Sequence, residues 1–185
     1  MSTVVDFRRS RNFKPKRPAE NGRFMGQSIY WKLYFVENVF RIVIHTILSI
    51  QVTPIPAPYH DWWEFLYHGT RMKDDAERAR RRYQASPSHT YPGRHGIYYV
   101  YLHDLGNIML DNALYFSPII PDVNNWVVKI AQVGLPRNCI GHMNLLNAHD
   151  REQISTLYFE CKALIRRLEK VKVGPELLVL KVPER

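Results

Sequence analysis

The segment 28–51 contains neither glycine nor proline, is dominated by large apolar side chains, and is followed by prolines at positions 54, 56 and 58. It predicts one long helix, because nothing in it interrupts backbone hydrogen bonding, and the prolines then enforce an extended connection. The apolar sequence also contains charged or titratable side chains, namely Lys32, Glu37, Arg41 and His45. They argue against a membrane span, so we expect a buried amphipathic helix.

Apolar residues at three- and four-residue steps, and capping residues before them, indicate further helices. Asp61 fits the N-cap of a second helix, whose later half from Arg71 onward is charged and reads as a solvated face. Asp150 and Gln153 form a capping-box-like start for a long last helix. Besides 28–51, we expect helices at 61–84, 104–112, 124–133 and 136–146, and from 150 to about 170.

The fold class that these segments predict is all-α, a helical bundle with irregular connections. Segment 97–102 fits either a short strand or the start of the next helix, and 177–182 fits a short extended segment. The helical domain is expected at 24–172, between a basic N-terminal arm at 1–23 and a C-terminal tail at 173–185.

Positive charge is concentrated at the N-terminus. The chain carries a formal net charge of +9, of which residues 1–23 supply +5. This distribution favours a polyanion such as RNA as partner, although an arm of this kind also serves as a solubilising tail. The candidate RNA-binding residues of the arm are Arg8, Arg9, Arg11, Lys14, Lys16 and Arg17.

The cysteine and histidine pattern indicates neither a disulfide framework nor a metal site. There are two cysteines, Cys139 and Cys161, and the eight histidines do not pair with carboxylates at a familiar ligand spacing. The basic N-terminus lacks an adjoining apolar signal core. We therefore expect a cytoplasmic protein without a cofactor, a metal or a membrane partner.

The hexapeptide Arg137-Asn138-Cys139-Ile140-Gly141-His142 follows Gly134-Leu135-Pro136, a plausible helix start with proline in the first turn. A guanidinium can clamp a phosphate and an imidazole can move a proton near neutral pH. A helix N-terminus would add positive dipole. The spacing alone favours a structural ion pair of Arg137 with a carboxylate and an ordinary histidine at 142.

The sequence resembles the HEPN superfamily, the helical bundles of prokaryotic ribonuclease toxins, phage-defence proteins and RNA-targeting CRISPR effectors. Arg137-Asn138-x-x-x-His142 is similar to the signature of that family. Tyr34–Leu48, with its Glu37 and Arg41 pair, resembles the first helix, and Leu102–Ile108 resembles a short helix that often precedes the signature.

The resemblance implies a metal-independent endoribonuclease, a toxin or phage-defence effector, that leaves a 2′,3′-cyclic phosphate. His142 would transfer protons, Arg137 would stabilise phosphate charge, and Asn138 would orient the phosphate or the histidine. The family precedent implies a homodimer that joins two signatures, and a partner such as an antitoxin or a defence-complex protein. Glu37 and Arg41 would position the signature helix, or form an ordinary intrahelical ion pair.

Two non-catalytic alternatives remain open on the sequence. A HEPN bundle with a silent signature would bind nucleic acid or a protein partner through the same basic arm. An adaptor within a larger complex would expose part of its tryptophan surface, although Trp62, Trp63 and Trp126 are more typical of a core. Only catalysis requires Arg137 and His142 to share an accessible cleft, and neither non-catalytic alternative does.

Overall fold

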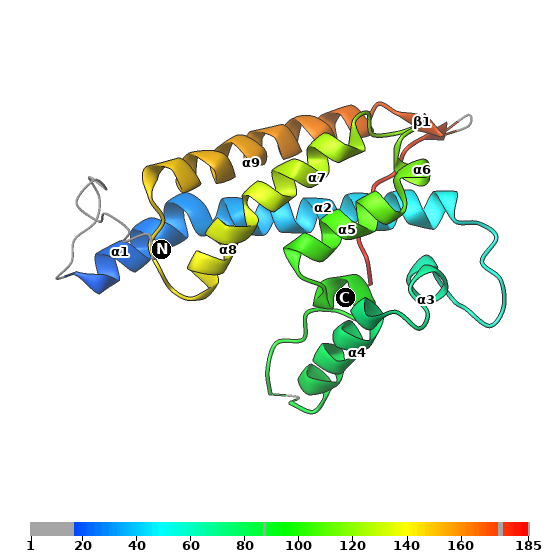
Figure 1. The fold of residues 1–185 in the computed structure, drawn as a ribbon, viewed down its shortest axis with the longest axis horizontal. Coiled ribbons are helices and arrows are strands. Elements are labelled where there is room, and N and C mark those ends of the chain that lie inside the picture. The colour runs from blue at the N-terminus through cyan, green and yellow to red at the C-terminus, as the bar shows by residue number, and fades with distance from the viewer. Residues whose placement is uncertain (1–16, 87, 174–175, 185) are drawn as a thin grey trace.

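The centre of the fold is one continuous helical rod (Figure 1). The computed structural model describes residues 17–86, 88–173 and 176–184. The rod comprises α1 (Pro18–Met25), the π-helical turn η2 (Gly26–Tyr30) and α2 (Trp31–Gln51). It has the length and apolar composition to cross a membrane, and 56% of its most apolar window is buried inside the fold. The prediction of a long buried helix over 28–51 is confirmed.

The rod begins earlier than the sequence indicated, at Pro18, where proline occupies the first helical position. Residues 18–23, expected in the basic arm, are therefore helical. Arg17 is the N-cap residue, and its guanidinium pairs with Glu20 at 2.7 Å. The other five candidate RNA-binding residues lie outside the described residues; they are Arg8, Arg9, Arg11, Lys14 and Lys16.

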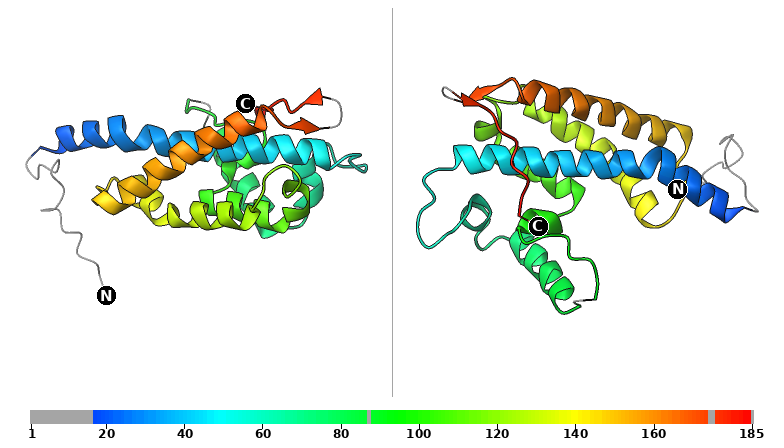
Figure 2. Two further views of the ribbon diagram at one scale, coloured as in Figure 1. Left: turned by 90° about the horizontal axis from the view of Figure 1, so that it is seen from above. Right: turned by 180° about the vertical axis from the view of Figure 1, so that it is seen from behind.

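Helices pack along the rod on more than one side (Figure 2). Those with the most contacts to the rod are α5 (Leu102–Asp111), α6 (Ala113–Phe116) and α9 (Ala148–Leu168). Helix α7 (Val123–Gln132) packs on α5, and α8 (Gly134–Gly141) packs on α7 and α9. The longest contact surfaces join α5 to α7 and α2 to α9. The stripe expected on the last helix is buried against α2, with Ile154, Leu157 and Leu168 among its members. The chain is therefore mostly α-helical around one core, as predicted.

The prediction of a single helix at 61–84 is wrong. The chain forms α3 (Trp62–Leu66) and α4 (Arg71–Gln84), separated by a turn in which Gly69 adopts a φ of +70°. That left-handed conformation lies in the turn between the two helices, and Thr70 starts the second by accepting a hydrogen bond from the Lys73 N–H. Asp61 caps α3 as predicted, since its Oδ1 lies 2.8 Å from the Glu64 amide nitrogen.

The tryptophans of the adaptor alternative are core residues. Trp62, Trp63 and Trp126 are all buried, which confirms the interpretation as core residues and leaves the adaptor alternative without the exposure it would need. Trp63 packs so closely on Gly96 that a Cβ there would lie 2.1 Å from the indole Nε1. Only glycine fits at 96 without displacement of this ring, which fixes the start of the segment that follows.

Segment 97–102 is neither a strand nor a uniform helix start. Residues Gly96–Tyr99 form the 3-10 turn η3, Val100 and Tyr101 are extended, and α5 begins at Leu102. The turn follows the His95 N-cap, whose Nδ1 accepts the Ile97 N–H at 3.2 Å. This irregular path carries the chain from α4 to the start of α5.

The C-terminal range is packed on the bundle rather than free of it. Two-residue strands β1 (Lys172–Val173) and β2 (Glu176–Leu177) pair antiparallel, and the chain then runs across α2 (Figure 2). The Lys181 N–H donates to Thr46 Oγ1 at 2.8 Å. The Glu184 carbonyl accepts from the amides of Arg94 and His95. Of the extended segment expected at 177–182, only the first residue belongs to a strand.

Candidate functional site

One face of α8 lines an open hollow of about 520 Å³, called here the α8 hollow. The face consists of Gly134, Arg137, Asn138, Gly141 and His142, which recur at helical spacing. The opposite wall is the start of α5, formed by Tyr101, Leu102 and His103. All three signature residues that the sequence singled out therefore border the same space.

The motif helix is shorter than predicted. It ends at Gly141, so His142 is the C-cap residue, and Met143 has a φ of +59° that turns the chain away. The expected continuation to Leu146 is wrong. His142 nevertheless stays on the signature face, because its N–H still donates to the Asn138 carbonyl at 3.0 Å. The imidazole thus lies at the C-terminal end of α8, not near the positive end.

Arg137 lies between the α8 hollow and a larger cleft of about 750 Å³ that it lines together with Glu37 and Arg41. The Arg137 side chain is 31% exposed, and its Nε lies 3.8 Å from Glu37 Oε2. Its Nη1 is 3.8 Å from the position that a Cβ would take at Gly141. The guanidinium is therefore tied to α2 and directed along α8 toward the residue before His142.

Glu37 and Arg41 form more than an intrahelical pair. Arg41 Nη2 lies 2.6 Å from Glu37 Oε1, and both side chains are nearly buried. The Arg41 guanidinium also donates to the carbonyls of Ile97 and Val100, at 3.2 and 3.4 Å. One carboxylate thus faces two arginines, and the second of them, Arg41, fastens the segment before α5 to α2.

Asn138 and His142 present unengaged side chains. Both residues are exposed, and within the described part of the chain neither side chain takes part in a hydrogen bond or an ion pair. Burial of a polar group is costly when it lacks a partner, but these groups are hydrated. They are free to engage a ligand that enters the hollow.

His103 is the residue of the hollow to which the sequence assigned no role. Its Nε2 lies 3.1 Å from Asp104 Oδ1, and its ring stacks on Tyr101 with centroids 5.7 Å apart and planes 8° apart. Asp104 Oδ2 also accepts the Tyr101 N–H at 2.9 Å. The resemblance had drawn attention to Leu102–Ile108 as a helix, but spacing along the chain could not bring His103 to α8.

A basic surface adjoins the α8 hollow. A second hollow of about 490 Å³ lies between α4 and the start of α5 and shares Tyr101 and His103 with the first. Helix α4 carries six Arg or Lys residues and three acidic ones. Its basic residues in this second hollow are Arg71, Arg78 and Arg82. The charged face of α4, which the sequence predicted to be a solvated surface, therefore flanks the signature residues.

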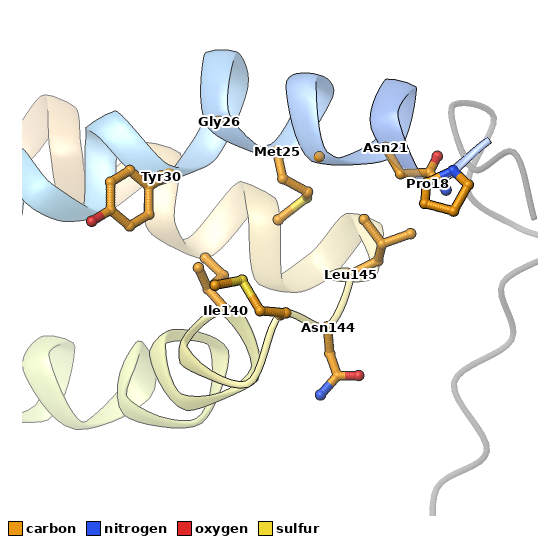
Figure 3. Close-up of a pocket in the computed structure, with 10 residues that line it drawn as sticks. Pro18, Asn21, Met25, Gly26, Tyr30, Ile140, Asn144 and Leu145 are labelled. Atoms are coloured by element: carbon orange, nitrogen blue, oxygen red, sulfur yellow. The ribbon is translucent and has the colours of Figure 1, made fainter.

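The other side of α8 borders an apolar pocket of about 680 Å³ (Figure 3). Met25 and Tyr30 from the rod face Ile140 and the loop residues Asn144 and Leu145 there. Among the described residues, no Asp, Glu, His, Lys, Arg or Cys side chain lines it. Its chemistry suits apolar contact, whereas the signature residues face the polar hollow on the opposite side.

Two further histidines serve the core. His45 accepts the Trp62 indole N–H at 3.2 Å. Burial, reinforced by repulsion from His45, lowers the pKa of His95 to about 3. Burial also lowers the pKa of His45. Both rings are neutral at pH 7 and packed between α2 and α3. Among the described residues, no three His, Cys, Asp or Glu side chains gather as a metal site requires.

No protein-family model, curated protein or solved structure matches this chain. The chemistry of the α8 hollow is accordingly judged from its own residues, their spacing and their contacts.

Proposed function

We propose that the protein is a HEPN-type endoribonuclease whose cleavage site is the α8 hollow. The observation that carries the proposal is that Arg137, Asn138 and His142 line one open hollow, while Glu37 ties the arginine to α2 from behind. An arginine, an amide and an imidazole on one helix face can stabilise phosphate charge, orient the phosphate and transfer a proton during transesterification of RNA.

The reaction would begin with attack of a ribose 2′-hydroxyl on the adjacent phosphorus. A 2′,3′-cyclic phosphate forms, and the 5′-oxygen of the next nucleotide leaves as a hydroxyl. His142 transfers a proton, since an imidazole can act as a general acid or base. Arg137 donates hydrogen bonds to the non-bridging oxygens as their charge grows. Asn138, one position along α8, orients the phosphate.

RNA would reach the hollow over α4. The second hollow, between α4 and the start of α5 and called here the α4 hollow, shares Tyr101 and His103 with the α8 hollow and is lined by Arg71, Arg78 and Arg82. Arginine and tyrosine together suit a single strand, since the guanidinium pairs with phosphate and the ring stacks on a base. The basic arm adds further charge to this interaction.

The HEPN resemblance extends the proposal to assembly and biology. It implies a homodimer in which two signatures approach each other, and a toxin or defence effector that a partner protein holds in check. The all-α bundle and the central helix with its Glu37–Arg41 pair support the HEPN-like reading of the fold.

The decisive experiment incubates purified protein with total RNA in excess EDTA and maps the ends of the products. We expect cleavage that EDTA does not prevent, with 2′,3′-cyclic phosphate and 5′-hydroxyl ends. Products with 5′-phosphate ends, or cleavage that EDTA abolishes, would contradict the proposed chemistry.

A binding module without activity is the second candidate, and the basic surface of α4 favours it independently of the signature. In that case RNA is bound but remains intact, and Arg82→Glu weakens binding more than Arg137→Ala does. Arg82 lines the α4 hollow and not the α8 hollow, so the two substitutions separate binding from chemistry.

A further inference from the structure

We propose that His103 is the second proton-transfer residue of the hollow, the general acid that complements His142 as general base within one chain. This assignment rests on the proposed ribonuclease function. A phosphoryl transfer of this kind needs one group to accept the 2′-hydroxyl proton and another to protonate the leaving oxygen. The signature itself contains a single histidine.

The placement of His103 is the first argument. It is one of eight residues that line the α8 hollow, and it lies on the wall opposite the signature face. Base and acid must act on opposite sides of the phosphorus in an in-line displacement. His142 at the end of α8 and His103 at the start of α5 border the same hollow from two different elements, as such a pair requires, and Arg137 borders it with them.

The fixed orientation of His103 is the second argument. Its side chain is 68% exposed, yet its ring is stacked on Tyr101 and its Nε2 faces the Asp104 carboxylate at 3.1 Å. The ionic contact with the Asp104 carboxylate holds Nε2 toward α5 when the imidazole is protonated. Nδ1 is thereby left for a substrate. Asp104 is held in turn by the Tyr101 N–H at 2.9 Å.

The charges around His103 suit the acid role. When protonated it forms an ion pair with Asp104, whereas His142 has no carboxylate partner among the described residues. The other ionisable groups that face it come from the two helices packed nearby. They are Arg137 and His142 of α8, and Arg71, Asp75, Arg78 and Arg82 of α4.

The proton transfers balance over the step. His142 takes the proton of the 2′-hydroxyl while the 2′-oxygen forms its bond to phosphorus. The bond from phosphorus to the 5′-oxygen breaks, and that oxygen takes the proton of the His103 imidazolium. His142 ends protonated and His103 neutral, so exchange of one proton with solvent at each residue restores the starting state. Every group required belongs to one chain.

The test compares His103→Ala, His142→Ala and the exposed-histidine control His149→Ala on two versions of one oligoribonucleotide. His149 lies at the start of α9, outside both hollows. The second oligonucleotide carries sulfur in place of the 5′-bridging oxygen at the mapped cleavage site. A thiolate leaves without protonation, so loss of the acid should matter little there, whereas loss of the base should matter on both.

We expect His103→Ala to cleave the oxygen substrate roughly two to four orders of magnitude more slowly, and the sulfur substrate within about tenfold of the wild type. The pH profile should lose its alkaline limb in this variant and its acidic limb in His142→Ala. His103→Asn, which keeps polarity without proton transfer, should behave as His103→Ala, and circular dichroism should show both folded.

Two results would overturn the assignment while leaving the ribonuclease standing. One is wild-type cleavage of the oxygen substrate by His103→Ala; the other is an equal loss on both substrates, which indicates binding instead of acid catalysis. A wild-type protein that cleaves neither substrate would refute the proposed function itself, and the role of His103 with it.

Discussion

Glu37 Oε2 lies 3.8 Å from Arg137 Nε, and this contact joins the central helix to the signature helix across one hundred residues of sequence. The same carboxylate holds Arg41 at 2.6 Å through its other oxygen. The carboxylate is 14% exposed, so water screens these interactions poorly. It orients Arg137 without touching a substrate in the α8 hollow, and thus acts as a positioning group.

Glu37→Gln should therefore affect both stability and cleavage. Loss of the carboxylate leaves the nearly buried Arg41 without its ionic partner, and we expect a loss of about 2–4 kcal/mol in the free energy of unfolding. Cleavage should slow about tenfold, mainly through kcat, because Arg137 is less well oriented. Denaturant unfolding and steady-state kinetics measure the two effects. Glu20→Gln, which breaks the exposed pair with Arg17, is the control and should cost below about 1 kcal/mol.

His142→Ala should abolish RNA cleavage, with a loss of roughly two to four orders of magnitude, because it removes the general base. RNA affinity and the thermal transition should change little, since the side chain is exposed and unpaired within the described residues. Arg137→Lys should be nearly as impaired as Arg137→Ala, because a point charge does not reproduce the guanidinium fork. Single-turnover kinetics give the rates, and an alanine variant that cuts at the wild-type rate would refute the role of His142.

Deletion of residues 1–16 should weaken RNA binding without loss of turnover. This range carries five basic residues and one acidic residue, ahead of the helix that starts at Pro18. The slope of log affinity against log salt should decrease by up to about 3 for a single-stranded ligand, because fewer counterions are released. Fluorescence anisotropy over a salt series provides the slope. Loss of cleavage at saturating RNA, with the fold intact, would assign the arm to the chemistry instead.

The homodimer that the resemblance implies should depend on the loop after α8. Met143 is 94% exposed and adjoins His142, so an interface that joins two signatures would cover it. Light scattering at micromolar concentration should give twice the chain mass for the wild type and a lower mass for Met143→Asp. Leu114→Asp, at an 87% exposed position on α6, is the matched control and should keep the dimer mass. A wild type that is monomeric and active would refute the dimer.

Acid should destabilise the protein through His95. Because burial lowers its folded pKa to about 3, the unfolded chain binds a proton below about pH 6.5 and the folded chain does not. The contribution of neutral His95 to the free energy of unfolding is therefore full above pH 6.5 and decreases as the pH falls toward 3. Between pH 7 and pH 5 the loss should be about 2 kcal/mol. The groups facing His95 are His45, Asp61 and Glu64.

Urea unfolding at pH 7 and pH 5 measures this loss. His95→Gln, which cannot titrate, should show a smaller difference between the two pH values, although His45 contributes in the same direction. His149→Gln should retain the wild-type difference, because it changes an exposed histidine. Equal pH dependence in all three proteins would contradict the role of His95.

The long helices could be predicted from the sequence because their pattern of buried residues repeats locally along the chain. The stripe of α9 and the apolar run of α2 each repeat at helical spacing over many turns, and proline or glycine marks their ends. The break at Gly69 had a local signal too. A glycine followed by Thr70, a good N-cap residue, indicates the end of one helix and the start of another.

Only part of the candidate site could be predicted from the sequence, because its walls come from distant parts of the chain. The signature residues share one helix face, so their spacing brings them together. His103 reaches them only through the path of η3 and α5, which depends on the fit of Gly96 against Trp63 and on the Arg41 contacts. The contact of Glu37 with Arg137 likewise depends on tertiary packing, which one-dimensional periodicity does not encode.

The C-terminal segment that crosses α2 has a consequence for the timing of synthesis. The Glu184 carbonyl holds the amides of Arg94 and His95, and the Pro183 carbonyl accepts the Tyr98 hydroxyl at 2.9 Å. These contacts anchor the turn that leads into Tyr101 and His103. The anchor is synthesised after every helix of the bundle, since translation and folding proceed from the N-terminus. A nascent chain therefore exposes its signature helix before the opposite wall of the hollow is secured.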